Sequence, residues 1–159
     1  MNNSIINIKK APYAFAKIKG RSDYSSINGI AYFYKVRTGV LVFIQLNGLP
    51  VPDEICKNPI FAVHIHSGGS CTGTDSDPFA DAMTHYNPDN CPHPYHAGDL
   101  PPIFGVNGLG FSAFLTNRFS PEEIIGKTVI IHYAPDDFTT QPSGNSGVKI
   151  ACGVISSVY

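Results

Sequence analysis

Short runs of apolar and aromatic residues recur along most of the chain, and turn-forming residues separate them. The runs are rich in β-branched and aromatic residues, whereas Gly, Pro, Asn and Asp lie between them. This pattern is typical of β-strands, and no window of about 11 residues has the spacing of an amphipathic helix. The sequence predicts eight strands, at Tyr13–Ile18, Gly29–Val36, Val40–Leu46, Ile60–His66, Ile103–Val106, Gly110–Leu115, Thr128–His132 and Lys149–Val154.

Short strands with turns between them favour an all-β Greek-key barrel or sandwich, because both arrangements protect the edges of the sheet. The runs Ile30–Val36 and Val40–Leu46 are apolar or aromatic at nearly every position. Such strands either bury both faces or pack an aromatic outer face against a partner. The pattern is therefore compatible with a subunit interface.

Two long segments interrupt the strand pattern, at about 67–102 and 133–148. Loops of this length without secondary structure of their own are usually functional or disordered. The first is rich in Gly, Asp, Asn, Pro and His, and it holds three of the six histidines. The chain has no internal repeat or linker, so residues 1–159 are expected to form a single domain.

Helix-forming signals are confined to one short stretch. Ser120 can act as the N-cap, Pro121 stands at the first helical position, and Glu123 is placed to close a capping box. One short helical turn is expected there.

Composition and charge narrow the class of protein. Eleven Lys and Arg stand against 12 Asp and Glu, which gives a net charge of −1. Nucleic-acid binding needs a basic face, and no basic cluster exceeds Lys9–Lys10, so no nucleic-acid partner is expected. No apolar run approaches the ~18 residues of a membrane span, so no membrane partner is expected either. The N-terminus lacks the apolar stretch of a secretory signal, which predicts a cytoplasmic protein, or an exported mature form if a leader has been trimmed.

The histidines are the main candidates for chemistry, since all six lie between residues 64 and 132. His64 and His66 are two residues apart in a predicted strand and so project from the same face. His93, His96 and Asp99 follow one another at three-residue intervals inside a polar loop. The sequence therefore predicts a metal centre.

Ligand chemistry divides these side chains between two metal ions. Four converging imidazoles suit Cu(II), and three imidazoles with a carboxylate suit a structural, tetrahedral Zn(II). His132 ends an apolar run that can lie beside the His64 strand and adds a further imidazole. The six histidines and Asp99 are one ligand short of eight places, so one ring has to be shared. His85 is the natural candidate, because it lies between the two groups and an imidazolate can bind one metal through each nitrogen.

These residues resemble the signatures of the copper,zinc superoxide dismutase family. The similarity runs from about residue 60 to 155 with every motif in order. The matching segments are Val63–His66 followed by Cys71, His85–Pro88, His96–Pro101, Gly126–His132 with Asp136 and Asp137 after it, Gly144–Gly147, and Ala151–Ile155. The resemblance implies the family's eight-stranded Greek-key barrel, with 67–102 as the metal-binding loop and 133–148 as a short electrostatic loop.

Carried over by position, the resemblance implies one copper and one zinc ion per subunit. The implied copper ligands are His64, His66, His85 and His132, and the implied zinc ligands are His85, His93, His96 and Asp99. The resemblance also makes Asp136 the carboxylate that links a copper ligand to a zinc ligand, and it makes Cys71 and Cys152 the family's disulfide. The implied reaction converts two superoxide anions to O₂ and H₂O₂ by Cu(II)/Cu(I) cycling, with His85 as bridge and proton carrier.

Several positions depart from the family pattern. Lys149 stands where the family normally places an arginine beside the copper channel, three residues before the disulfide cysteine. It keeps the positive charge needed to guide the anion but lacks the planar fork, so weaker orientation is expected. The 133–148 loop has no Lys or Glu, and the short interval from His93 to His96 requires a tighter zinc loop.

Three questions stay open at the level of sequence. A copper- and zinc-binding protein without turnover, such as a copper chaperone or store, is the alternative function, although such relatives typically lack a copper ligand and none is missing here. Cys56 and Cys91 have no role in the family pattern; they are free thiols, a second disulfide, or, for Cys91, a metal contact. Relatives are often homodimers, so a homodimer is a further expectation.

Overall fold

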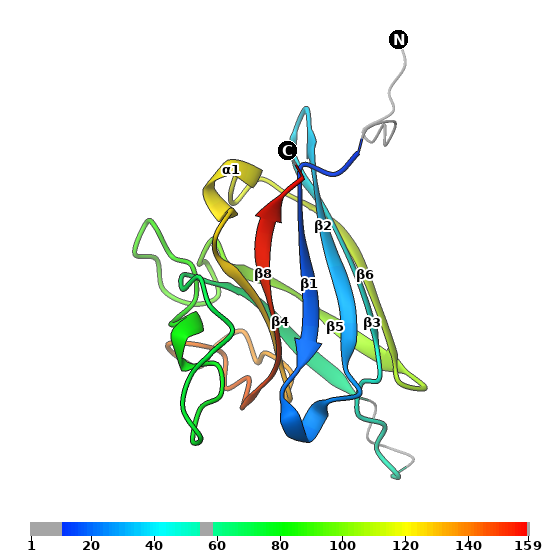
Figure 1. Cartoon of the computed structure of the whole chain (residues 1–159). Coiled ribbons are helices and arrows are strands. Elements are labelled where there is room, and N and C mark those ends of the chain that lie inside the picture. The colour runs from blue at the N-terminus through cyan, green and yellow to red at the C-terminus, as the bar shows by residue number, and fades with distance from the viewer. Residues whose placement is uncertain (1–10, 55–58, 159) are drawn as a thin grey trace.

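Eight antiparallel strands close into a barrel in the computed structural model, which describes residues 11–54 and 59–158 (Figure 1). Around the barrel the strands follow the order β1-β2-β3-β6-β5-β4-β7-β8, so the chain crosses over between β3 and β4, as in a Greek key. The predicted fold is confirmed. The strands are β1 (Ala14–Gly20), β2 (Asn28–Val36), β3 (Gly39–Asn47), β4 (Ile60–His66), β5 (Asp99–Val106), β6 (Leu109–Thr116), β7 (Thr128–His132) and β8 (Lys149–Ser157).

Strand β5 differs most from its prediction, since it begins at Asp99 and not near Ile103. The loop predicted at 67–102 therefore ends earlier. The sequence pattern did not predict this part of the strand because it contains Pro101 and Pro102. Proline cannot donate a hydrogen bond to a sheet ladder and is found mainly at edges and bulges. They lie at an irregularity in the pairing with β4, where the register shifts between Phe61 and Val63.

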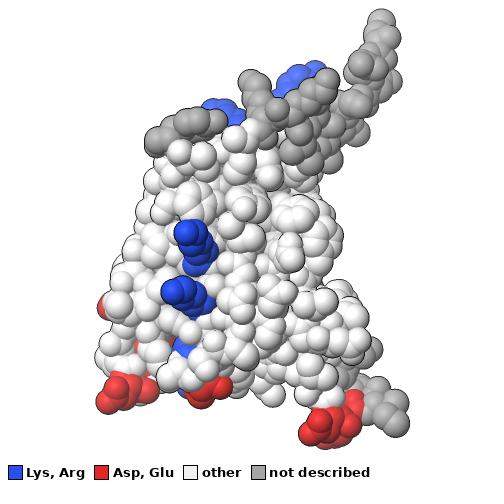
Figure 2. All heavy atoms as spheres, turned by 45° about the vertical axis from the view of Figure 1, so that its right-hand side comes forward, with Lys and Arg blue, Asp and Glu red and all other residues white. Residues whose placement is uncertain are grey.

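The inward faces of the strands form one apolar core, while part of the outer surface is also apolar. Phe33 and Ile44 are fully buried, whereas Tyr32 and Phe43 pair across β2 and β3 on the outer face. Figure 2 turns this side of the barrel forward; it carries few charged side chains, and the acidic ones gather at its lower end. The two strands therefore do not bury both faces within the barrel; the packing of the aromatic outer face against a partner stays a prediction.

Helical structure is limited to short turns in the described residues: α1 (Pro121–Ile124) and the 3₁₀ turns η1 (Ser22–Tyr24) and η2 (Ala80–Ala82). The predicted capping contact is present, since the Ser120 backbone N–H donates to the Glu123 carboxylate at 2.6 Å. None of these turns is long and apolar enough to cross a membrane.

The two long loops lie on the same side of the barrel (Figure 1). One joins β4 to β5 and the other joins β7 to β8. They are tied by a reciprocal pair: the His93 N–H donates to Gln141 Oε1 at 3.0 Å, and Gln141 Nε2 donates to the His93 carbonyl at 2.7 Å. The two loops are thereby joined to each other outside the barrel.

A disulfide anchors the first loop to the last strand. Cys71 and Cys152 are joined, as the family resemblance implied, and Phe79 and Ile130 pack around the bond. Cys91 is a free thiol. Cys56 lies outside the described residues, so its pairing stays a prediction.

Candidate metal centre

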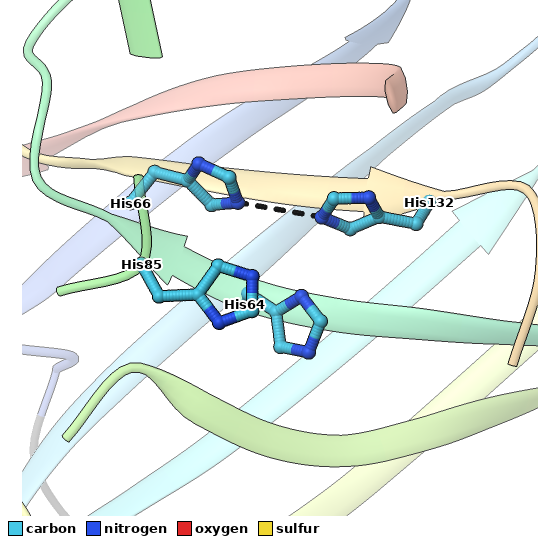
Figure 3. Close-up of side chains that lie close together, drawn as sticks. All are labelled: His64, His66, His85 and His132. Atoms are coloured by element: carbon cyan, nitrogen blue, oxygen red, sulfur yellow. Dashed lines mark hydrogen bonds between the residues drawn. The ribbon is translucent and has the colours of Figure 1, made fainter. Parts of the chain in front are cut away.

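Adjacent strands bring the first group of imidazoles together. His64 and His66 project from β4, and β7 pairs with β4 so that its last residue, His132, reaches the same place. His85 joins them from the loop through an isolated β-bridge with His66. All four rings are buried (Figure 3). The structure thus brings together the four side chains that the family resemblance assigned to copper.

The backbone sets the tautomers of two of these rings. His66 Nδ1 lies 2.8 Å from the Met83 carbonyl, and His132 Nδ1 lies 3.2 Å from the Gly147 carbonyl. A carbonyl oxygen only accepts, so Nδ1 carries the proton in both rings and Nε2 keeps its lone pair. The two Nε2 atoms are 3.3 Å apart.

These facing lone pairs have no proton to share. Burial lowers the pKa of His66 to about 2 and, together with the neighbouring His64, that of His132 to about 3, so both rings are neutral at pH 7. Two buried lone pairs at this distance need a cation between them. The geometry therefore fits a metal ion better than a hydrogen bond.

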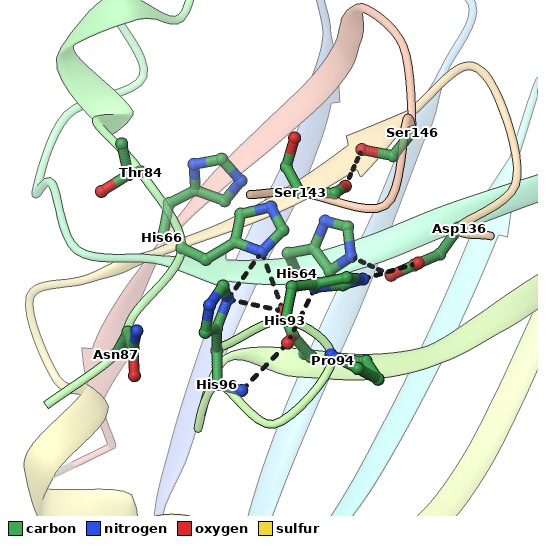
Figure 4. A network of polar contacts seen from close by, with 12 residues as sticks. His64, His66, Thr84, Asn87, His93, Pro94, His96, Asp136, Ser143 and Ser146 are labelled. Atoms are coloured by element: carbon green, nitrogen blue, oxygen red, sulfur yellow. Dashed lines mark hydrogen bonds and ion pairs between the residues drawn. The ribbon is translucent and has the colours of Figure 1, made fainter. Parts of the chain in front are cut away.

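A single carboxylate orients one ring from each group. Asp136 accepts from His64 Nε2 at 2.8 Å and from His93 Nε2 at 2.9 Å (Figure 4). Burial alone would raise the pKa of Asp136, but hydrogen bonds from His64, the Phe138 N–H and His93 lower it to about 2. Asp136 is therefore ionised and holds both histidines with their Nδ1 atoms free.

Three ring nitrogens are left buried without a hydrogen-bond partner among the described residues: His64 Nδ1, His85 Nε2 and His93 Nδ1. His93 Nδ1 lies 3.0 Å from an Asp99 oxygen, but without the alignment of a hydrogen bond. An orphaned buried polar atom costs about 1–3 kcal/mol. Metal ligation would satisfy all three atoms, so the residues present fit the two implied metal ions.

The second group surrounds the other nitrogen of His85. His85 Nδ1 lies 2.8 Å from Asp99 Oδ1 and 3.4 Å from His96 Nδ1, and His96 Nδ1 lies 3.3 Å from Asp99 Oδ1. Ligands of a tetrahedral Zn²⁺ with Zn–N bonds of about 2.0 Å are roughly 3.3 Å apart. Burial raises the pKa of Asp99 but contacts with the histidines outweigh it, so the pKa is lowered and the carboxylate is charged.

Taken as sets, the ligand atoms of each group lie within 4.8 Å of one another, and His85 belongs to both. The sets are His64, His66, His85 and His132, and His85, His93, His96 and Asp99. Within the described part of the chain these are the same two sets that the family resemblance implied. The His85 Nδ1 contacts Asp99 and His96 of the second set, and its Nε2 is buried without a hydrogen-bond partner among the described residues, which fits a bridging imidazolate.

Arg118 supports the second group and was not anticipated. Its Nη1 donates to the carbonyls of Pro94, His96 and Asp99 at 3.0, 3.3 and 3.2 Å. The residue lies between β6 and α1, far from the loop in sequence. No pattern signals such a role, because it depends on the barrel bringing the two segments together.

Lys149 lies where the sequence placed it, but with a partner that the sequence did not predict. It lines a pocket of about 400 Å³ together with His66, His85 and His132. Its Nζ donates to Asp77 Oδ2 at 2.8 Å and to the Phe79 carbonyl at 3.0 Å. The cation at the mouth of the site is therefore paired with a carboxylate from the first loop.

Comparison with known proteins agrees with this geometry. A model of the copper/zinc superoxide dismutase family matches residues 27–155. The chain is 33% identical to a Cu-Zn superoxide dismutase of Deinococcus radiodurans over 83% of this chain and 79% of that protein. It is 32% identical to Cu-Zn superoxide dismutase 2 of Aquifex aeolicus, over 80% and 78%. The mouse extracellular superoxide dismutase is 29% identical over 85% of this chain and 55% of its own length.

Proposed function

Because the chain belongs to the copper/zinc superoxide dismutase family, we propose that it converts two superoxide anions and two protons into O₂ and H₂O₂. The observation that carries the proposal is His85, which belongs to two different buried ligand sets. Structural zinc sites do not need a shared imidazole. A shared imidazole is useful where a metal that changes its oxidation state lies beside a metal that does not.

We propose that His64, His66, His85 and His132 hold copper, and that His85, His93, His96 and Asp99 hold zinc. The orphaned nitrogens and the facing Nε2 lone pairs support this division. Copper, when bound, supplies one-electron redox chemistry, and zinc supplies a fixed positive charge without redox change. The side chains of this protein supply orientation, protons and access.

His85 is proposed to carry a proton between the two halves of the reaction. The first superoxide gives up an electron and leaves as O₂, and the second takes an electron and two protons to become H₂O₂. His85 Nε2 is buried without a hydrogen-bond partner among the described residues, so it is free to hold one of these protons when it is not a ligand. Its Nδ1 stays with Asp99 and His96, which keeps the ring in place.

Access to the site follows from the pocket. The rings of His66, His85 and His132 line it together with Lys149, which is the one Lys or Arg among the described residues of its lining. A positive charge at the entrance attracts a small anion and raises the rate of encounter; the handling of superoxide by dismutases is a known case of such steering. We propose that Lys149 serves this role here.

The proposal is tested by measuring superoxide decay with pulse radiolysis on protein loaded with copper and zinc. We expect fast, catalytic decay that is lost on removal of copper. Stoichiometric binding of both metals without turnover would contradict the proposal and favour the alternative, a copper- and zinc-binding protein that is not an enzyme.

We further propose that the protein forms a homodimer through the apolar outer face of β5 and β6. Phe104, Val106, Leu109 and Phe111 are each 56–64% exposed on this face. They line a groove of about 550 Å³, and Phe43 packs edge-on against Phe111 with ring centroids 4.9 Å apart. Large exposed apolar patches mark interaction sites, and none of the described residues that line the groove is charged, which suits a second copy of the same face.

A further inference from the structure

The Lys149 side chain lines the substrate pocket and also contacts one carboxylate. Lys149 opens β8 and pairs in register with His132, the last residue of β7. Its side chain is 16% exposed and lines the pocket beside the copper-site rings. Any group that alters its charge therefore acts close to the reacting centre.

Asp77 is such a group, and its position is built into the fold. Its Oδ2 accepts from Lys149 Nζ at 2.8 Å, while its Oδ1 accepts from the Phe79 N–H at 3.1 Å. Phe79 packs in a small cluster with Cys152, whose disulfide to Cys71 ties this loop to β8. The contact is thus held by covalent and packing constraints and is not a chance meeting of surface side chains.

Asp77 is ionised in this setting. Partial burial raises the pKa of its carboxyl, but the hydrogen bond from Lys149 and that from the Phe79 N–H outweigh burial and lower the pKa. A carboxylate in contact with an ammonium cancels most of its field beyond a few ångströms, because a dipole decays faster with distance than a single charge. Lys149, the one Lys or Arg among the described residues that line the pocket, is therefore largely neutralised.

We propose that Asp77 is a positioning residue that sets how strongly Lys149 attracts anions into the pocket. The inference rests on the proposed function. Lys149 has a second anchor, the Phe79 carbonyl at 3.0 Å, so its place does not depend on the charge of Asp77. Asp77 thereby moderates the attraction of the pocket for anions and leaves the ligand sets untouched.

The substitution Asp77→Asn removes the negative charge and keeps the size of the side chain. Its single amide oxygen can accept from Lys149 or from the Phe79 N–H, but not from both, and the Phe79 carbonyl still holds the Lys149 ammonium. We expect azide, titrated into the copper- and zinc-loaded protein and followed by its absorbance, to bind roughly twofold to tenfold more tightly at low salt. The kcat/KM for superoxide should rise by a similar factor, with a steeper fall as salt is added.

The matched control is Asp75→Asn. Asp75 lies on the same loop, is exposed, and has no polar side-chain contact in the part of the chain that the structure describes. It changes the net charge equally, so an equal effect of both substitutions would overturn the inference, as would weaker azide binding in Asp77→Asn. In a Lys149→Gln background Asp77→Asn should lose its effect on azide; a persisting effect would also overturn it.

The outcome is distinguishable from failure of the proposed function. Tighter azide binding in Asp77→Asn, without dismutation by any variant, would support the inference about anion attraction and contradict the enzyme. Dismutation with unchanged azide binding in Asp77→Asn would do the reverse.

Discussion

Asp136 controls the protonation of two rings at once, and this makes it a sensitive residue. Both of its oxygens accept hydrogen bonds, so both His64 and His93 present an unprotonated Nδ1 to the ligand sets. An asparagine keeps one acceptor and replaces the other by an NH₂ donor. One ring would then have to move its proton to Nδ1 and could no longer ligate through that atom.

We therefore expect Asp136→Asn to weaken metal binding by roughly 10- to 100-fold, the usual cost of losing such a partner. Chelator competition with the purified protein measures the affinity. The neighbouring Asp137→Asn is the control, since Asp137 Oδ1 accepts from the Thr139 and Thr140 N–H groups and an amide oxygen can do the same. Equal losses in both variants would contradict a specific role for Asp136.

His132 tests the division of ligands between the metals. It belongs to the first set and is not among the residues of the second. We expect His132→Ala to abolish superoxide turnover while zinc stays bound, which metal analysis after dialysis would reveal. Retained turnover would mean that the proposed copper site is wrong.

Sequence reasoning reached the ligand side chains because each belongs to a short motif with strong chemistry. His64 and His66 share a strand face, and His93, His96 and Asp99 follow one another at three-residue intervals. Asp77 and Arg118 were out of reach, because their roles depend on contacts over 72 residues to Lys149 and over 19–24 residues to backbone carbonyls. Carbonyl acceptors carry no sequence signal.

At the scale of elements, the short segment between β6 and α1 stabilises the zinc-side loop. One guanidinium nitrogen of Arg118 accounts for three carbonyls of that loop. We expect Arg118→Met to lower zinc affinity more than copper affinity, because a methionine side chain has no N–H to donate to these three carbonyls. Competition titrations with each metal separately test this. Equal losses for both metals would indicate general destabilisation instead.

The disulfide is the second constraint on the same loop. It closes a segment of 81 residues in sequence separation, for which a chain-entropy argument gives a stabilisation of about 4 kcal/mol. The double variant Cys71→Ser with Cys152→Ser should show that loss in urea unfolding of the metal-free protein. An unchanged unfolding midpoint would show that packing around Phe79 holds the loop without the bond.

Strand prediction succeeded for most elements because turn residues and the two-residue period agree. Strand β4 and strand β7 match their predicted bounds, and these carry three of the ligands. The exception, β5, begins early because Pro101 and Pro102 fill an irregular part of the ladder. A strand that contains a bulge has no clean period for a sequence pattern to detect.

The whole molecule combines a net charge of −1 with a nearly uncharged side and a locally charged pocket. Low charge on the outer face favours self-association, because apolar surface there is not opposed by like charges. The outward aromatic residues that the sequence indicated on β2 and β3 continue onto β5 and β6 in the barrel. Only the closed topology, in which β3 neighbours β6, makes this continuity visible.

We expect Phe111→Lys to convert the proposed dimer into a monomer, since it places a charge on each side of the interface. Phe111 is 59% exposed, so the substitution leaves the core intact. Sedimentation equilibrium of the wild type and the variant measures the change. A wild-type monomer at all concentrations, or an unaffected dimer in the variant, would contradict the proposed interface.

The shared carboxylate of Asp136 has a consequence for how the two metals load. Whatever ion orders His93 also fixes Asp136, and through it the ring of His64 in the other set. The two binding equilibria are therefore linked, and linkage is reciprocal: zinc must raise the affinity for copper by the same factor as copper raises that for zinc. A molecule with one metal bound would thus bind the second metal more tightly than an empty molecule does. At limiting metal, empty and fully loaded molecules would then outnumber molecules that hold one metal.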